Sequence, residues 1–126
     1  MMADTKAKRD AERRGRRSEL LAALSLMIKG YRILGRRVRT KAGEIDLVAR
    51  APSGIVCFIE VKARDGLGAA QDALGPRQQA RIARAAALYL ARWPGLAARG
   101  IRFDLVTVPR QGWPRHFRDA WRAGAS

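Results

Sequence analysis

Apolar residues recur at helical spacing in two stretches of the chain. The first set is Leu20, Leu21, Leu24, Met27 and Ile28. It predicts a helix over about residues 10–29 that ends at Gly30. The second set follows Pro76, a residue suited to the first turn of a helix, and comprises Ile82, Ala86, Tyr89, Leu90 and Trp93. Residues 1–9 lack such a pattern, and we expect them to form a disordered basic tail.

Shorter apolar runs, rich in β-branched residues, predict strands at 31–40, 44–50, 55–64 and 101–108. Gly35 indicates a bulge or bend in the first run, and the turn APSG makes the second and third runs a hairpin. The closing stretch 113–124 has Trp113, Phe117 and Trp121 four residues apart, which predicts a short amphipathic helix. The order α-β-β-β-α-β-α predicts one α/β domain over residues 10–126, with a mixed β-sheet flanked by helices.

Three charged residues interrupt the apolar hairpin: Asp46, Glu60 and Lys62. A register in which Arg50 faces Val56 keeps polar side chains opposite polar side chains, whereas a shift by one residue would set an apolar face against a polar one. This register places Asp46 directly opposite Glu60, with their Cβ atoms about 5 Å apart. Two facing carboxylates repel each other unless a positive group lies between or beside them.

A divalent cation would satisfy both carboxylates, and their hard oxygens suit Mg²⁺ or Mn²⁺. The carbonyl of Val61 could add a third oxygen, and the ammonium of Lys62 would lie beside the ion, where it could stabilise charge on a phosphate or position a water. The alternative is purely structural. In that interpretation Glu44 pairs with Lys62 across the hairpin, and an arginine neutralises Asp46 or Glu60.

The chain has 26 Lys and Arg residues against 11 Asp and Glu, a net charge of +15, and 21 of the 26 are arginine. Such an excess favours polyanions, and the planar guanidinium suits phosphate. Nucleic acid is therefore the expected partner, with an acidic membrane or protein surface as the alternative, although genome composition accounts for part of the arginine content. Cys57 and His116 are the only residues of their types, which excludes an internal disulfide, a Cys-rich zinc site and a catalytic histidine pair. Cys57 is expected to be buried, and this cysteine usage fits a cytoplasmic protein.

The segments GEIDLVAR and FIEVKAR resemble the D-x(n)-ExK core of the PD-(D/E)xK, or restriction-endonuclease-like, nuclease superfamily. The chain is most similar to the YraN-type family of bacterial proteins, and the similarity runs from about residue 15 to residue 108. It includes the opening GRRSELLAALSLMIKGYRIL, the helix GPRQQARIARAAALYLA and the strand IRFDLVTV. The joint occurrence of these segments in order is more specific than any single one.

The resemblance implies a fold similar to archaeal Holliday-junction resolvases and a Mg²⁺-dependent hydrolysis of phosphodiester bonds. Under it, Asp46 and Glu60 hold the ion, Lys62 assists the reaction, and Glu19 completes the metal shell from the first helix. Gln79 matches a polar position that often faces the site. The structural alternative for Glu19 is a solvated helix charge.

The chain departs from the family pattern at two places. Ile45 stands where the superfamily name has proline, and Gln78 stands where the family often has lysine, which removes a cation from the second helix. We expect Asp104 to form a buried ion pair with an arginine in preference to a metal bond, and His116 to be solvated in the tail.

Three functions remain open from the sequence. The first is a metal-dependent DNA endonuclease that acts on branched DNA. A homodimer would be compatible with this function, because enzymes that cut paired strands are often dimers. The second is a nucleic-acid-binding accessory protein that keeps the nuclease fold with little or no catalysis, and the third is a structural or interaction role. No stretch approaches the roughly 20 apolar residues of a membrane span, and DNA is preferred to RNA as the expected partner.

Overall fold

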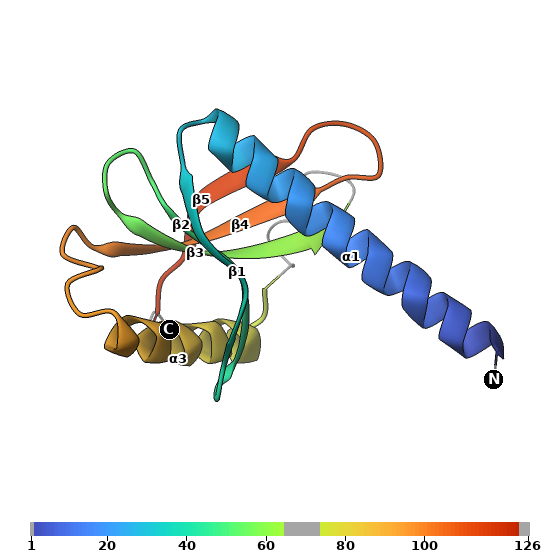
Figure 1. Ribbon diagram of the computed structural model, residues 1–126, viewed down its shortest axis with the longest axis horizontal. Coiled ribbons are helices and arrows are strands. Elements are labelled where there is room, and N and C mark those ends of the chain that lie inside the picture. The colour runs from blue at the N-terminus through green and yellow to red at the C-terminus, as the bar shows by residue number, and fades with distance from the viewer. Residues whose placement is uncertain (1, 65–73, 124–126) are drawn as a thin grey trace.

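Two helices lie on opposite faces of a five-stranded sheet (Figure 1) in the computed structural model, which describes residues 2–64 and 74–123. The helices are α1 (Met2–Ile28) and α3 (Pro76–Arg92). The strands are β1 (Arg32–Thr40), β2 (Gly43–Arg50), β3 (Val56–Ala63), β4 (Ile101–Val108) and β5 (Arg115–Trp121). They lie side by side in chain order, with β3 and β4 parallel and every other neighbouring pair antiparallel. The predicted α/β class with a mixed sheet is confirmed.

The prediction of a helix at the C-terminal end is wrong, because residues 115–121 form the edge strand β5 and the order is α-β-β-β-α-β-β. A spacing of four residues is even, so Phe117 and Trp121 can share one face of a strand as well as one face of a helix. Both side chains pack into the core on the α3 side, and Trp121 stacks on Phe103 with ring centroids 4.1 Å apart. Pairing with β4 therefore decides a pattern that the sequence left ambiguous.

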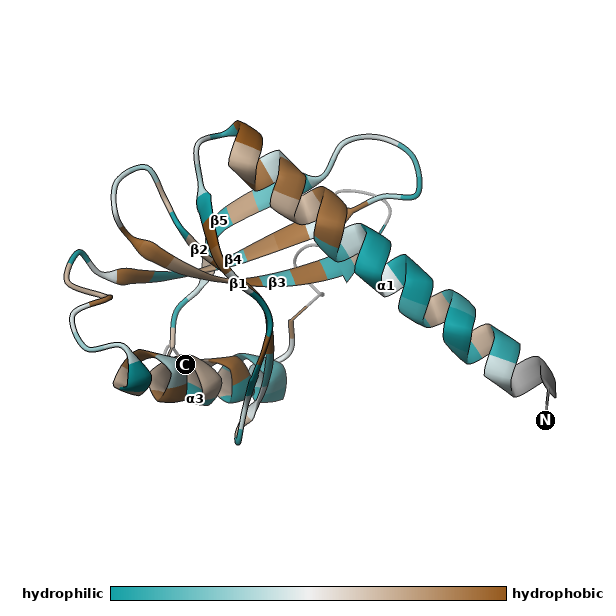
Figure 2. Cartoon of the chain, in the orientation of Figure 1, coloured by the Kyte–Doolittle hydropathy of each residue, from teal (hydrophilic) through white to brown (hydrophobic). Residues whose placement is uncertain are grey.

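The sheet separates two hydrophobic cores. The core under α3 contains Phe58, Ile82, Phe103 and Leu105, and the core under α1 contains apolar side chains of the odd positions of β3, such as Ile59. Cys57 belongs to the α1 core and is fully buried, as expected. Figure 2 shows β4 as mostly hydrophobic, in keeping with a central strand that is covered on both faces.

Helix α1 has two different halves. Among the described side chains from residue 5 onward, Ser18 is the first that is buried, and the N-terminal half of the helix, which is mainly hydrophilic, extends beyond the sheet (Figures 1 and 2). The helix begins at Met2, so the stretch that we expected to be a disordered tail is helical from that residue onward. The C-terminal half packs on the sheet through Ala22, Ala23 and Leu26.

The β1–β2 hairpin bends sharply. Its register shifts between Ile33 and Gly35, which confirms the bulge predicted at Gly35. A Cβ atom at Gly35 would lie 2.8 Å from Cγ2 of Val38 in the same strand, so a larger residue would force the Val38 side chain or the bulge itself to shift. The bend brings the hairpin tip to α3, where Gly43 lies against the side chain of Arg81. Strand β2 thus passes from one face of the molecule to the other, and Asp46 lies at this crossing.

Candidate active site

The register predicted for the β2–β3 hairpin is confirmed, since Arg50 is paired with Val56 and the ladder continues to Leu47 and Ile59. The next residues in this register are Asp46 and Glu60. The regular ladder ends there, and the backbone N–H of Val61 donates a 2.8 Å hydrogen bond to Oδ2 of Asp46. The two strands therefore separate at the position where the sequence places the two carboxylates, and the Asp46 side chain enters the gap.

The face of β2 also changes at this point. Ile45 belongs to the core under α3, whereas Leu47 and Ala49 belong to the core under α1. A regular strand would keep these three odd positions on one face. Asp46 lies between Ile45 and Leu47, where the strand changes face, and side chains from both helices can approach it there.

Glu60 is 7% exposed and has two neighbouring donors. Nε2 of Gln78 donates a 2.7 Å hydrogen bond to its Oε1, and Nζ of Lys62 lies 3.4 Å from the same oxygen. Burial raises the pKa of Glu60, and the charge of Lys62 opposes this rise. The side chain is thus held in place by α3 on one side and by its own strand on the other.

Burial, followed by the negative charge of Glu60, raises the pKa of Asp46 from 3.8 to about 7. The hydrogen bond from Val61 favours the ionised form but does not compensate for these two effects. Without a cation, the pair formed by Asp46 and Glu60 therefore holds on to a proton near neutral pH. A cation bound between the carboxylates would reverse this preference.

Glu19 of α1 and Glu44 of β2 complete an acidic group around Asp46. One carboxylate oxygen from each of these three residues lies within 4.8 Å of the others. Glu19 was expected at the site from the family resemblance, whereas Glu44 was expected only as a partner of Lys62. Its position two residues before Asp46, on the same side of the strand, is the sequence signal that could have identified it.

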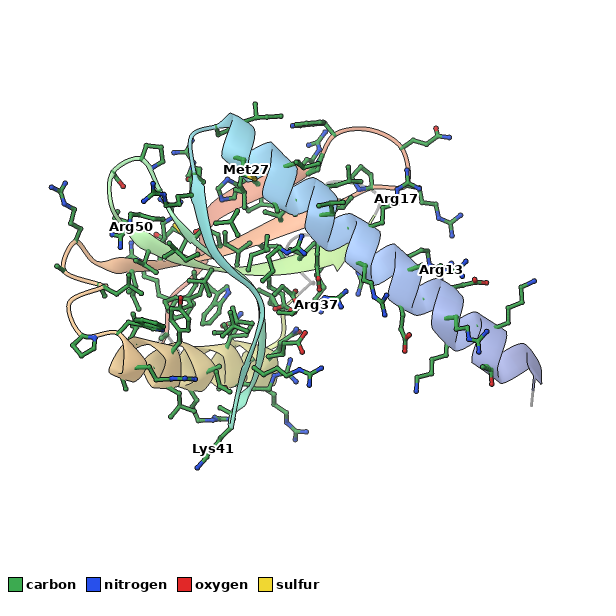
Figure 3. The ribbon with its side chains drawn as sticks, viewed as in Figure 1. Arg13, Arg17, Met27, Arg37, Lys41 and Arg50 are labelled. Carbon is green, nitrogen blue, oxygen red and sulfur yellow. The ribbon has the colours of Figure 1, made fainter. Side chains whose placement is uncertain are left out.

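Two arginines approach this acidic group. Nε of Arg37 lies 2.6 Å from Oε2 of Glu19, and Nε of Arg39 lies 3.7 Å from Oε2 of Glu44 at a more exposed position. Figure 3 shows Arg37 beside α1, in keeping with this ion pair. The ion pairs of the described residues differ from those of the structural alternative. Arginine pairs with Glu19 and Glu44 instead of Asp46 or Glu60, and Lys62 pairs with Glu60 instead of Glu44.

The carbonyl of Val61 is directed toward the same gap. The N–H and the C=O of one strand residue point to the same edge of the strand. Because the N–H of Val61 meets Asp46, its carbonyl also faces β2. The donor set near the gap thus consists of carboxylates and one backbone carbonyl, which are the ligand types that Mg²⁺ and Mn²⁺ prefer.

The two neighbouring glutamines in the first turn of α3 have different contacts. Gln79 donates a 3.1 Å hydrogen bond from Nε2 to the carbonyl of Leu74, while Gln78 reaches Glu60. The family resemblance predicts a role for Gln79 and marks position 78 only as one where a lysine is missing. The side chain that touches a candidate site residue is that of Gln78.

Asp104 and His116 form a separate buried network. Asp104 is fully buried and accepts hydrogen bonds of 2.8 Å from both Nε and Nη2 of Arg102, which confirms the expected ion pair with an arginine. Nε2 of His116 lies 2.7 Å from Oδ2 of Asp104, and the His116 side chain is 5% exposed. The expectation of a solvated His116 is wrong, because β5 pairs with β4 and brings the ring against the buried carboxylate.

Among the described residues, no helix is long and apolar enough to cross a bilayer. The long helix α1 has a hydrophilic N-terminal half (Figure 2).

Comparison with known proteins gives one consistent result. The family described as "Uncharacterised protein family UPF0102" matches residues 18–108. A UPF0102 protein of Maricaulis maris is 52% identical over 122 residues, covering 97% of this chain and 95% of the relative. A UPF0102 protein of Parvibaculum lavamentivorans is 52% identical over 112 residues (89% and 84%), and one of Paramagnetospirillum magneticum is 49% identical over 122 residues (94% and 94%). These matches confirm the resemblance to the YraN-type family, and the names of the relatives state no activity.

Proposed function

The chain belongs to the UPF0102 family, and on that premise we propose that it is a metal-dependent endonuclease that hydrolyses phosphodiester bonds of nucleic acid, DNA in preference to RNA. The observation that carries the proposal is the carboxylate pair Asp46 and Glu60 at the point where β2 and β3 separate. Such a pair is unfavourable without a cation, as the raised pKa of each carboxyl indicates. A site of this kind is better explained by a bound ion than by stability.

The ion that fits these donors is Mg²⁺ or Mn²⁺. Asp46, Glu60 and the carbonyl of Val61 would hold it, with Glu19 joining from α1 and Glu44 as a further carboxylate of the group. When bound, the ion neutralises the carboxylates and polarises a phosphate oxygen. Arg37 would have to release Glu19 if that carboxylate joined the shell, because its guanidinium now lies 2.6 Å away.

Lys62 supplies the positive charge of the chain itself at this site. Its side chain is largely buried, and its ammonium lies 3.4 Å from Glu60. An ammonium held in this way can stabilise negative charge that develops on a phosphate and can orient an attacking water. Gln78 positions Glu60, and Gln79 ties the first turn of α3 to Leu74. Gln79 therefore enters the proposal as a positioning residue.

The first experiment is a cleavage assay with purified protein on branched and linear DNA in Mg²⁺, Mn²⁺ or EDTA. We expect cleavage with the metals and none with EDTA. Lys62→Ala and Asp46→Ala should each lower the rate by at least about 10²-fold, the scale on which charged active-site groups act. Lys41→Ala is the matched control, because Lys41 is an exposed cation at the turn between β1 and β2 (Figure 3). Cleavage that survives in the Asp46 and Lys62 variants would contradict the proposal.

The second candidate is an accessory protein that binds nucleic acid with little or no catalysis. The observation that favours it is the occupation of two acidic ligands, since Arg37 pairs with Glu19 and Gln78 binds Glu60. It predicts salt-sensitive binding of DNA or RNA that Lys62→Ala leaves nearly unchanged. Hydrolysis by the wild-type protein that the Asp46 and Lys62 substitutions abolish would reject it.

A further inference from the structure

A groove with a volume of about 1010 Å³ lies between α1 and the ends of β3 and β4. Four arginines from three parts of the chain line it: Arg14 and Arg17 of α1, Arg64 directly after β3, and Arg110 in the segment between β4 and β5. No carboxylate belongs to the described residues that line this groove. Figure 3 shows Arg17 on the side of α1 that faces the segment joining β4 to β5.

Ser18 and Gln111 are polar, but most of the remaining lining is apolar, and these apolar side chains are called the floor of the groove. Leu21 and Val108 contribute to it, and both belong to or pack against the core under α1. The backbone N–H of Arg64 donates a 3.2 Å hydrogen bond to the carbonyl of Val108, which fixes the end of β3 to β4 at this floor. The groove thus offers guanidinium groups at its walls and hydrocarbon between them.

The groove begins close to the candidate active site. Strand β3 carries Glu60 and Lys62 and then runs to Arg64, which at about 3.3 Å per residue lies roughly 13 Å from Glu60 along the strand. Helix α1 links the two places as well, since Ser18 lines the groove while Glu19 belongs to the acidic group. A chain of phosphates that passes the acidic group can therefore continue into the groove.

The described part of the walls carries arginines and no carboxylate, which favours a ligand with several phosphates. The apolar floor distinguishes between double-stranded and single-stranded nucleic acid as the ligand. In a duplex the bases are stacked inside and the phosphates face outward, so the floor would have no apolar partner. A single strand can turn its phosphates to the arginines while its unpaired bases make apolar contacts with aliphatic side chains of the floor. A volume near the upper end of the roughly 300–1,000 Å³ of small-molecule sites accommodates a few nucleotides.

We propose that this groove holds a single-stranded segment of nucleic acid next to the bond that the candidate active site cleaves. The inference rests on the proposed function and specifies its substrate class: nucleic acid with an unpaired arm or flap beside the cleaved position. The paired part of such a substrate would lie beyond the acidic group, outside the groove.

The test measures binding without cleavage, so that it does not depend on catalysis. Fluorescence anisotropy in EDTA would measure the affinity of the wild type and of the double variant Arg17→Gln/Arg64→Gln for three labelled ligands. The ligands are an oligothymidylate, a linear duplex and a forked duplex. We expect at least a tenfold loss of affinity for the oligothymidylate and the fork, and a salt dependence lower by about 1.4 in its logarithmic slope for two lost phosphate contacts. The affinity of the double variant for the linear duplex should fall less than threefold.

The matched control is Arg84→Gln/Arg92→Gln, which removes the same charge from exposed positions of α3 on the opposite face of the sheet. An equal loss in the control variant would overturn the proposal, because binding would then depend on net charge alone. An equal loss for duplex and single strand in the groove variant would overturn it in favour of a duplex site. All four substituted arginines are exposed, and unchanged unfolding temperatures would show that folding is intact.

A second ligand tests the apolar floor. A chain of abasic nucleotides has the same phosphates as the oligothymidylate but no bases. We expect it to bind the wild-type protein at least about fivefold more weakly, and equal binding would overturn the role of the floor. Mapping the cut on a forked substrate with Mg²⁺ then addresses catalysis separately, so that failure to cleave would reject the proposed function while the binding results still decide the use of the groove.

Discussion

The substitution Asp46→Asn tests whether the repulsion between the carboxylates of Asp46 and Glu60 lowers the stability of the folded protein. Asparagine is nearly the same size and keeps a carbonyl oxygen that can accept the hydrogen bond from the N–H of Val61. It removes the negative charge that faces Glu60. If the pair is strained, the variant should be more stable than the wild type above neutral pH, although it loses the proposed function.

The pKa of Asp46 sets the size and the direction of this effect. In the folded protein the value is raised from 3.8 to about 7, so the folded state binds the proton more tightly than the unfolded state. Stability linked to Asp46 is then fully present below about pH 3.8 and is lost as the pH rises to about 7. Between pH 5 and pH 7 the loss is at most about 2.7 kcal/mol at about 1.36 kcal/mol per pKa unit. Because Asp46 is only half-buried, water screens part of this, and we expect roughly 1–2 kcal/mol.

The assay is urea unfolding in EDTA at about pH 5 and about pH 8 for the wild type, Asp46→Asn and the control Glu12→Gln, an exposed carboxylate of α1. The difference in unfolding free energy between Asp46→Asn and the wild type should grow by roughly 1–2 kcal/mol from the lower to the higher pH. Glu12→Gln should show no such growth. A difference that stays constant with pH, or an Asn variant that is less stable at the higher pH, would refute the reasoning.

The same samples test the metal. Adding Mg²⁺ should stabilise the wild type in proportion to the logarithm of its concentration above the dissociation constant. The Asn variant should respond much less, because it lacks one of the two facing carboxylates. Equal stabilisation of both proteins would place the ion elsewhere.

Three further predictions concern the fold. Asp104→Ala should cost about 3–5 kcal/mol in urea unfolding, because it leaves the half-buried Arg102 and the buried side chain of His116 without their hydrogen-bond partner. Since the pKa of Asp104 is lowered to about 2, its contribution to stability should be present above about pH 4 and lost as the pH falls through 2. Trp121→Ala should cost about 3–5 kcal/mol because it removes the ring stacked on Phe103, whereas Trp113→Ala, at a site 60% exposed, should change unfolding by less than about 0.5 kcal/mol. Gly54→Ala should lower the unfolding temperature by a few degrees, because Gly54 has φ of 96° and a Cβ there would clash with the side chain of Arg99.

Local patterns were sufficient for most of the fold. The register of the β2–β3 hairpin followed from parity alone, because a one-residue slip would have exposed apolar side chains and buried polar ones. The helix α3 followed from Pro76 and the spacing of Ile82 and its apolar neighbours. The strand β5 could not be predicted, because the interval between Phe117 and Trp121 fits both periods and its pairing with β4 depends on a contact between distant residues.

The two central carboxylates of the candidate site could be predicted from the sequence, whereas two of the side chains around them could not. Asp46 and Glu60 were found because charges in an apolar hairpin are costly and because their register was fixed. Glu44 and Gln78 were missed, since their positions depend on the bend of the β1–β2 hairpin and on the placement of α3 against β3. Neither feature leaves a periodic signal in the sequence, and only the packed structure brings these side chains to the carboxylates.

The electrostatics of the two buried acids of the sheet separate a structural carboxylate from a functional one. Asp104 is fully buried and satisfied by Arg102 and His116, and its pKa is lowered to about 2, so its charge is stabilised by the fold. Asp46 is less buried, yet burial and then the negative charge of Glu60 raise its pKa to about 7, and the hydrogen bond from Val61 does not compensate for them. The chain carries 21 arginines, and an arginine paired with Asp46 would have lowered this cost. A cation bound in the gap would neutralise the uncompensated charge of the two carboxylates. Asp46, in preference to Asp104, is therefore the residue on which to test catalysis first.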